Sequence, residues 1–205
     1  MEPFQFKEDV TMYDVKVVVE GTGRGLLMHK FSIAASAGLE NEVKKAKAVK
    51  FTPEVDAEMV AYRLDKVDGQ EKGQLCLPAE HFLSSITAAG TSFQKKGQGK
   101  KTYKGAFQGS VEVSPDYIGL TNVSGNALMD YEIDSRPVRI KATQGRIIRH
   151  RPHIKIWRAS FTIQVADDSI PLEVVQAALE EAGKSKCVGD YRPRYGQFRI
   201  VSFEQ

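Results

Sequence analysis

Arginine and histidine are concentrated in one stretch of the sequence, GRIIRHRPHIKIW at residues 145–157, which contains no acidic residue. A second stretch, GDYRPRYGQFRI at residues 189–200, repeats the Arg-Pro pair about forty residues later. A guanidinium group is a planar fork that holds a phosphate through two hydrogen bonds, whereas lysine supplies mainly a point charge. Both stretches therefore indicate binding of an anion, with phosphate as the best match.

The two Arg-Pro pairs constrain where their arginines lie. Proline restricts the preceding residue to extended backbone and removes one donor from a sheet. We therefore expect Arg151 and Arg192 at a sheet edge or a loop rim, where a guanidinium can meet a phosphate. The alternative is an internal salt bridge to Asp190 or Glu180.

Basic residues are unevenly distributed along the chain. Residues 95–205 hold 18 Lys and Arg against 12 Asp and Glu, and residues 1–94 hold 11 against 14. All 18 fall in three stretches, 95–104, 136–158 and 184–199. Three basic clusters favour a polyanionic partner such as single-stranded RNA or DNA. The residues expected to contact phosphate are Lys95, Lys96, Lys100, Lys101, Lys104, Arg146, Arg149, Arg151, Arg192 and Arg194.

A glycine-rich segment, GTGRGLLMHKF, follows the first predicted strand. It lacks the GK[ST] sequence of a P-loop, but its glycines allow backbone to approach a ligand closely. We expect Gly23, Arg24, Gly25 and His29 to line the same groove as the arginines. His29 could also act as a general base that takes the proton of a ribose 2′-hydroxyl as this hydroxyl attacks the adjoining phosphate. The alternative is that His29 only forms hydrogen bonds and has no catalytic role.

Aromatic residues are interleaved with the basic ones, as expected where unpaired bases stack on rings. Tyr103 adjoins the lysine-rich stretch, and Tyr191 and Tyr195 lie in the final basic stretch. Trp157 is in phase with Phe161 and is expected in the core. Tyr103 is accordingly the residue that we expect to contact a base.

Other chemistry is poorly represented in the sequence. There is no GxSxG or HExxH motif, and Asp167 and Asp168 precede a predicted helix whose N-terminus they favour. His150 and His153 are three apart and should point to opposite faces of a strand, so we expect no metal site and no cofactor. The chain contains no run of about 18 apolar residues and begins with an acidic segment, which predicts a cytoplasmic protein without a membrane partner.

Periodicity predicts an α+β fold. Strands are expected at 12–20, 57–64, 73–78, 106–113, 117–122, 157–165 and 198–203, and helices at 39–50, 78–90 and 171–182. Two β-α-β units follow, which predicts a ferredoxin-like or RRM-like split β-α-β core with β-rich insertions. The chain is expected to be one domain, 1–205, with insertions at about 21–77, 91–105 (a mobile basic loop) and 114–150.

Four segments resemble the RAMP superfamily of CRISPR-associated proteins, most nearly the backbone subunits that polymerise along guide RNA. They are GRGLLMHKFS, LCLPAEHFLSSITAAG, the basic insertion, and the closing EAGKSKCVGDYRPRYGQFRI. The resemblance is to a short and divergent relative, of the kind that a virus or plasmid carries. It implies an RRM-like core, single-stranded RNA held through its backbone, and head-to-tail copies within a larger ribonucleoprotein.

Three functions are compatible with the sequence. The first is a non-catalytic subunit that binds single-stranded nucleic acid, with guide RNA as the expected ligand, and assembles in several copies. The second is a metal-independent RAMP endoribonuclease that processes repeat RNA, with His29 as its base. The third is a viral structural or assembly protein whose basic strands contact acidic protein surfaces.

Overall fold

The computed structural model describes residues 13–30, 52–67, 69–139 and 144–205, and its centre is a six-stranded sheet. The strands are neighbours in the order β3-β5-β8-β1-β9, and β4 also pairs with β8. Every pairing in this sheet is antiparallel. The strands are β1 (Tyr13–Gly21), β3 (Cys76–Pro78), β4 (Val111–Ser114), β5 (Tyr117–Thr121), β8 (Arg158–Val165) and β9 (Phe198–Glu204).

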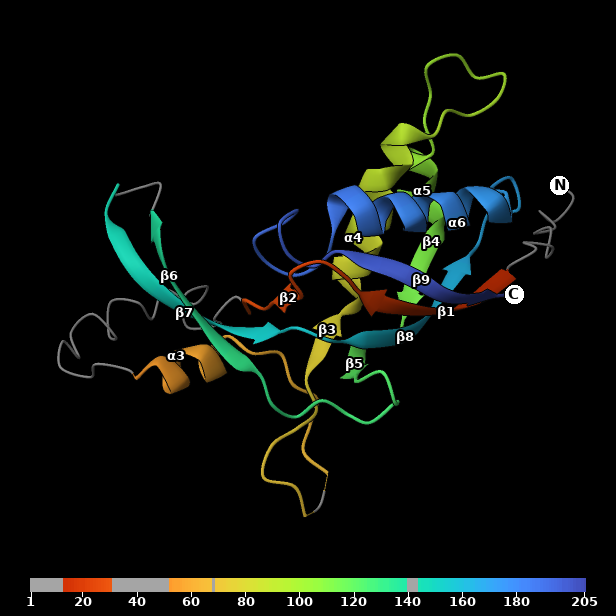
Figure 1. Cartoon of the computed structure of the whole chain (residues 1–205). Helices are drawn as coiled ribbons and strands as arrows, with labels where there is room; N and C mark the ends of the chain where they lie inside the picture. The colour runs from red at the N-terminus through yellow and green to blue at the C-terminus, as the bar shows by residue number, and fades with distance from the viewer. Residues whose placement is uncertain (1–12, 31–51, 68, 140–143) are drawn as a thin grey trace, which may run out of the picture.

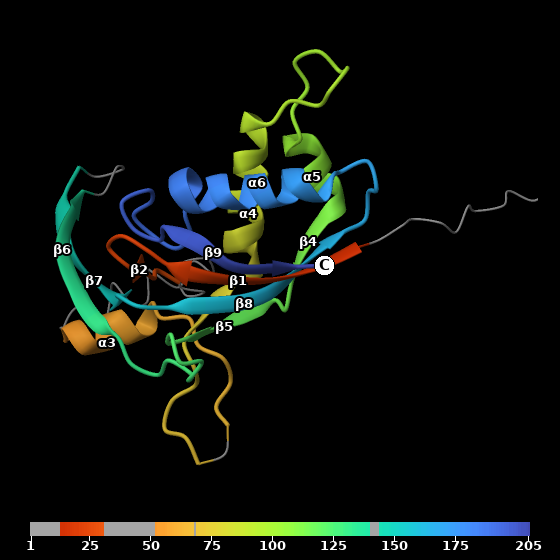
Figure 2. The same cartoon turned by 45° about the vertical axis from the view of Figure 1, so that its right-hand side comes forward.

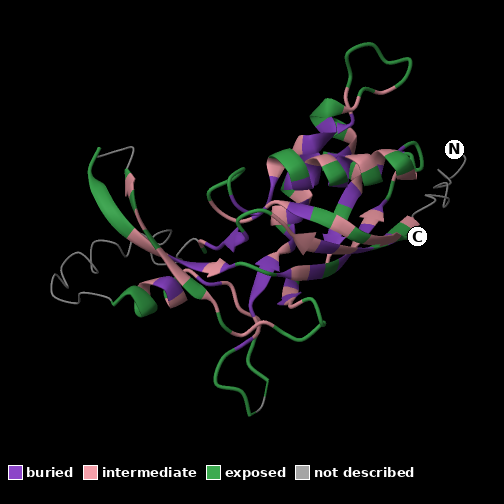
Figure 3. Cartoon of the chain, in the orientation of Figure 1, coloured by how far each residue is buried: buried purple, intermediate pink, exposed green. Residues whose placement is uncertain are grey.

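Two helices, α4 (Ala79–Ala89) and α6 (Leu172–Glu181), cover one face of this sheet and contact each other (Figures 1 and 2). The shorter α5 (Lys104–Ser110) and the helical turns η1 (Gly90–Ser92) and η2 (Ala182–Lys186) complete the layer. Figure 3 shows buried residues where the helices meet the sheet. The predicted α+β class is therefore confirmed.

Side-chain periodicity explains this packing. Val15, Val17 and Val19 alternate with charged or partly exposed residues along β1, so one face of the strand is apolar. Val17 pairs with Phe161 of β8, whose ring centroid lies 4.5 Å from that of Phe82 on α4. Trp157 is fully buried in the same core, as the sequence predicts.

A second sheet extends away from the first as a long hairpin (Figure 1). Strands β6 (Glu132–Arg139) and β7 (Arg146–Ile154) pair antiparallel, and the short β2 (Leu26–Leu27) adds to the other edge of β7. Helix α3 (Pro53–Met59) contacts both hairpin strands. The Asp56 carboxylate on α3 accepts a hydrogen bond of 3.2 Å from the backbone N–H of His150.

Two predicted strands are wrong over part of their length. In residues 57–64, α3 continues to Met59, because Thr52 caps the helix through its side chain and Pro53 opens the first turn. In residues 106–113, α5 occupies the first part and buries Phe107, and β4 begins only at Val111. The predicted helix at 39–50 lies outside the described residues.

In the part of the chain that the structure describes, no helix has both the length and the apolar composition needed to cross a bilayer.

Candidate nucleic-acid interface

The glycine-rich segment and the C-terminal loop lie side by side, joined by backbone hydrogen bonds. Thr22 N–H donates to Gln197 O, Gly196 N–H to Gly25 O, and Asp190 N–H to Leu27 O, each at 2.8 Å. We call residues 22–29 and 187–197 the paired loops. The expectation that the glycine-rich segment and the final arginines share one region therefore agrees with the structure.

The glycines of the paired loops serve mainly to bring backbones together. Gly25 is buried at φ +80°, and a Cβ there would lie 2.4 Å from the carbonyl oxygen of Ile154. Gly196 has φ +75°, and a Cβ there would lie 1.7 Å from the carbonyl oxygen of Val188. The prediction that Gly25 lines a ligand groove is wrong, because β7 covers it. Gly23 is exposed.

The β6–β7 hairpin presents one face to the paired loops. Directly opposed residues of an antiparallel pair share a face, and alternate pairs face the same way. The register therefore places three pairs on what we call the inner face: Glu132 with His153, Asp134 with Arg151, and Arg136 with Arg149. His153 and Arg149 connect this face to the glycine-rich segment, since His153 Nε2 lies 2.7 Å from Arg24 O and Arg149 Nη1 lies 2.7 Å from His29 Nε2.

Arg151 is not available to a phosphate. It is 5 % exposed, and its Nε lies 2.7 Å from Oδ2 of Asp190. The N–H does not align with the carboxylate, so charge attraction rather than a hydrogen bond holds the pair. The internal salt bridge that the sequence left open is the arrangement observed, and the prediction that Arg151 binds phosphate is wrong.

Arg136, Arg151, Tyr191 and Tyr195 form what we call the arginine–tyrosine cluster. Arg136 pairs with Asp134 and donates a 2.7 Å hydrogen bond to the Tyr195 hydroxyl. Its guanidinium carbon lies 5.0 Å from the centroids of both tyrosine rings, and that of Arg151 lies 5.4 Å from the Tyr191 ring. Hydrogen bonding to the Asp134 carboxylate raises the pKa of Arg136 above its ordinary value.

This cluster fixes the C-terminal loop to the hairpin. Nothing in the local sequence distinguishes Arg136 as a site residue, although the alternation of tyrosine and arginine in YRPRY indicates that the loop is aromatic and basic.

Four arginines around the paired loops make up what we call the arginine surface: Arg24, Arg149, Arg192 and Arg194. Arg149 is half-buried and the other three are exposed. Within the described residues none of the four has a carboxylate partner. The surface therefore carries positive charge that the described residues do not neutralise.

His29 is poorly placed to act as a base. Arginine has no acceptor atom, so Arg149 donates to Nε2 and the ring must carry its proton on Nδ1, which is buried without a hydrogen-bond partner. Burial, with Arg149 as the next cause, lowers the pKa of His29 and keeps the ring neutral near pH 7. The lone pair that would accept the 2′-hydroxyl proton is thus already engaged, which favours the hydrogen-bonding role.

Arg146 lies on the opposite face of the hairpin from Arg149. Its cross-strand partner is Arg139, so two like charges face each other where the strands near their ends. Directly opposed like charges destabilise a strand pair. Both side chains are exposed and unpaired among the described residues, so a bound anion would stabilise this part of the hairpin.

The lysine-rich loop is remote from the arginine surface. Residues 94–102 form a small hairpin closed by the bridge between Gln94 and Thr102, at the end of the helical layer away from the β6–β7 hairpin (Figure 1). Lys96, Lys100, Lys101 and Lys104 are exposed there. The lysine-rich loop and the arginine surface therefore do not share one groove.

Tyr103 belongs to the core rather than to a binding surface. It is 9 % exposed, its ring centroid lies 6.0 Å from that of Phe107, and Lys95 Nζ lies 5.3 Å from its ring centroid. The prediction that Tyr103 contacts a base is wrong, because the turn into α5 draws the ring inward.

The open face of the central sheet lacks the features of an RNA platform. Along β1, β8 and β9 this face carries polar or charged side chains with Val18 and Val201, and no aromatic residue. The exposed Tyr117 lies on β5, on the other side of β8 from β1. RRM domains bind RNA by stacking bases on aromatic residues of this face. Glu20 also pairs with both Arg158 and Arg199, at 2.6 and 2.7 Å, and so offsets part of their charge. The strands β1, β8 and β9 therefore offer no aromatic stacking surface of the RRM kind.

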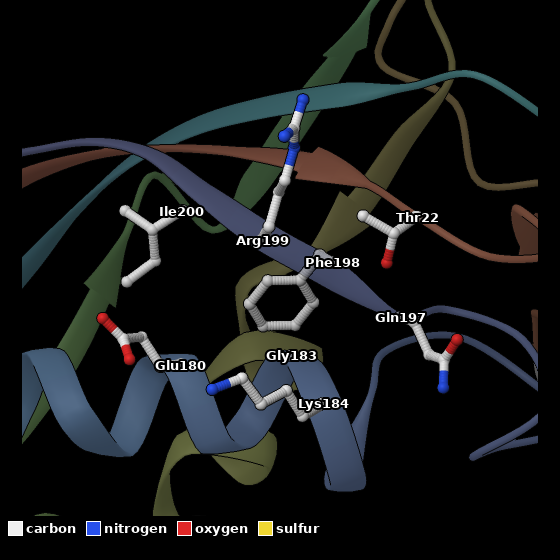
Figure 4. Close-up of a pocket in the computed structure, with 8 residues that line it drawn as sticks. All are labelled: Thr22, Glu180, Gly183, Lys184, Gln197, Phe198, Arg199 and Ile200. Atoms are coloured by element: carbon white, nitrogen blue, oxygen red, sulfur yellow. The ribbon is translucent and has the colours of Figure 1, made fainter.

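A pocket of about 440 Å³ lies beside the paired loops, between β9 and η2 (Figure 4). Thr22 and Gln197 line it where the loops begin, and Glu180, Lys184 and Arg199 supply charge of both signs. Because Arg199 is already paired with Glu20, this pocket offers a phosphate less free charge than the arginine surface does.

The chain matches no protein-family model and no curated protein.

Proposed function

We propose that this chain is a non-catalytic module that binds the phosphate backbone of single-stranded nucleic acid, with RNA preferred, on the arginine surface. One observation carries the proposal. Four arginines without carboxylate partners among the described residues lie on three segments that contacts hold together. Phosphate contacts from arginine supply affinity without sequence preference.

The fold supports a ferredoxin-like assignment of the core. The path β4-β8-β1-β9 is antiparallel throughout, with α4 between β1 and β4 in the chain and α6 between β8 and β9. These are the elements of a split β-α-β unit. The β6–β7 hairpin and the C-terminal loop would supply the binding surface that the sheet face lacks.

We also propose that several copies assemble along one strand. The outer edge of β9 has no partner strand among the described residues, and Val201 on this strand is 46 % exposed. An unpaired edge offers backbone groups to a neighbouring chain. Mass measurement of the protein with and without RNA tests this: complexes whose mass rises in whole protomers with RNA length support assembly, and a single protomer at every length contradicts it.

Fluorescence anisotropy with a labelled single-stranded RNA of mixed sequence tests the binding function. We expect the logarithm of the binding constant to fall linearly with the logarithm of salt concentration, because phosphate contacts release counterions. The same strand as DNA and as a duplex gives the preference, and a gel of the RNA afterwards should show it intact. Failure to bind any of these probes at about 0.05 M salt would overturn the proposal, and metal-independent cleavage lost in His29→Ala would favour the endoribonuclease.

A further inference from the structure

We propose that Tyr191 is a stacking platform for one unpaired nucleobase of the bound strand. This inference rests on the proposed function and adds a specific contact to it. Tyr191 is 37 % exposed and lies between Asp190 and the exposed Arg192 of the arginine surface. Arg192 and Arg194, which are exposed, lie one and three residues after Tyr191 in the same loop.

Two arginines and a tyrosine contact the ring. Arg136 and Arg151 share the inner face of the hairpin, and their guanidinium carbons lie 5.0 and 5.4 Å from the Tyr191 ring centroid. Tyr195 meets the same ring edge-on, with centroids 6.5 Å apart at 86°. These contacts come from the hairpin and the base of the loop, and 37 % of Tyr191 remains exposed to solvent beside them.

The two tyrosines of the cluster differ in what they contribute. Tyr195 is 7 % exposed and its hydroxyl accepts a hydrogen bond from Arg136, as expected of a residue that anchors the loop. The Tyr191 hydroxyl has no hydrogen-bond partner among the described residues, and more than a third of the residue is open to solvent. An anchoring role therefore does not account for the exposed ring.

The backbone at Tyr191 adopts a conformation that an aromatic residue normally avoids. Its φ is +60°, in the left-handed region that favours glycine and asparagine. The Asp190 carboxylate stabilises this turn by accepting a 2.8 Å hydrogen bond from the Tyr191 N–H. Strained residues of this kind persist where surrounding contacts hold them, and they concentrate at ligand sites. Two guanidinium groups and a carboxylate thus fix an exposed ring in advance, which reduces the entropy that a stacking base must lose.

Two substitutions separate the ring from the backbone conformation. Tyr191→Asn removes the ring, and asparagine can still adopt the left-handed backbone conformation at this position. Tyr191→Phe keeps the ring and removes only the hydroxyl group. The probes are an oligouridylate of about 12 nucleotides and an abasic ribose-phosphate strand of the same length. We expect Tyr191→Asn to weaken binding of the oligouridylate by about 10-fold and to leave the abasic strand nearly unchanged, since stacking needs a base. Tyr191→Phe should bind both probes as the unmodified protein does.

The outcomes separate the inference from the function on which it rests. Unchanged affinity of Tyr191→Asn for the oligouridylate, or equal losses for both probes, would overturn stacking while leaving phosphate binding intact. If the unmodified protein binds neither probe, the proposed function itself fails. Should Tyr191→Asn prove unfolded by circular dichroism, photocrosslinking of the unmodified protein to 4-thiouridine RNA decides: a crosslink at Tyr191 supports the inference, and crosslinks elsewhere overturn it.

Discussion

Removal of two exposed charges, in Arg192→Ala with Arg194→Ala, is expected to weaken RNA binding by a calculable amount. Both side chains are exposed and have no carboxylate partner within the described residues, so their loss breaks no ion pair seen in the structure. For single strands, each phosphate contact adds about 0.7 to the steepness with which the logarithm of the binding constant falls against the logarithm of salt concentration. Near 0.1 M salt this corresponds to about 5-fold in affinity for each contact. The double variant should therefore bind about 25-fold more weakly there, with a slope lower by about 1.4.

A matched variant removes the same charge from the other end of the molecule. Lys100→Ala with Lys101→Ala changes the lysine-rich loop, which lies far from the arginine surface (Figure 1). This pair should change affinity by less than about 2-fold and leave the slope nearly unchanged, because long-range attraction is screened at this salt concentration. Equal losses in the two double variants, measured by anisotropy over a salt series, would refute the assignment of phosphate contacts to the arginine surface.

Three further predictions concern the architecture that positions this surface. Asp190→Asn should lower the free energy of unfolding, measured in urea, by about 2 kcal/mol, because it leaves the buried Arg151 charge without its partner. The loss is expected to be smaller than for a fully buried ion pair, since the Asp190 side chain is partly exposed. An unchanged urea midpoint would contradict this prediction. The pKa of His29 is lowered in the folded protein, so as the pH falls the unfolded chain takes up this proton first, and the stability of the fold should decrease below about pH 6.5. Melting curves of His29→Gln should show a smaller decrease over the same pH range. An identical decrease in the variant would show that His29 does not cause the pH dependence. Gly196→Ala should lower the free energy of unfolding by at least about 2 kcal/mol more than Gly97→Ala does. Both glycines have positive φ, but only a Cβ at residue 196 would clash with backbone atoms. Equal losses of stability in the two variants would contradict the packing of the C-terminal loop.

Strands β1, β5, β8 and β9 and helices α4 and α6 could be predicted from the sequence because burial imposes local periodicity. One buried face of a strand is indicated by the alternation of Val15, Val17 and Val19, and one buried face of a helix by the spacing of Phe82 and Ile86. The structure buries all five side chains. The strand predicted at residues 57–64 is wrong over its first part because the helix start signals, Thr52 and Pro53, lie before this segment.

The site was only partly predictable because side-chain partners depend on contacts distant in sequence. Arg151 meets Asp190 only after the C-terminal loop folds back onto β7, and no local pattern distinguishes that pairing from a free arginine. The same holds for Tyr103, which the turn into α5 draws into the core. Charge clustering identified the basic segments, but it carried no information on which segments share a surface.

Mapping of photocrosslinks between the protein and single-stranded RNA that contains 4-thiouridine tests the central claim most directly. We predict crosslinked peptides from residues 22–29, 146–154 and 187–197, the segments that carry the arginine surface and the hairpin beside it. Crosslinks confined to the lysine-rich loop at 94–102 or to the open face of β1 and β8 would contradict the account.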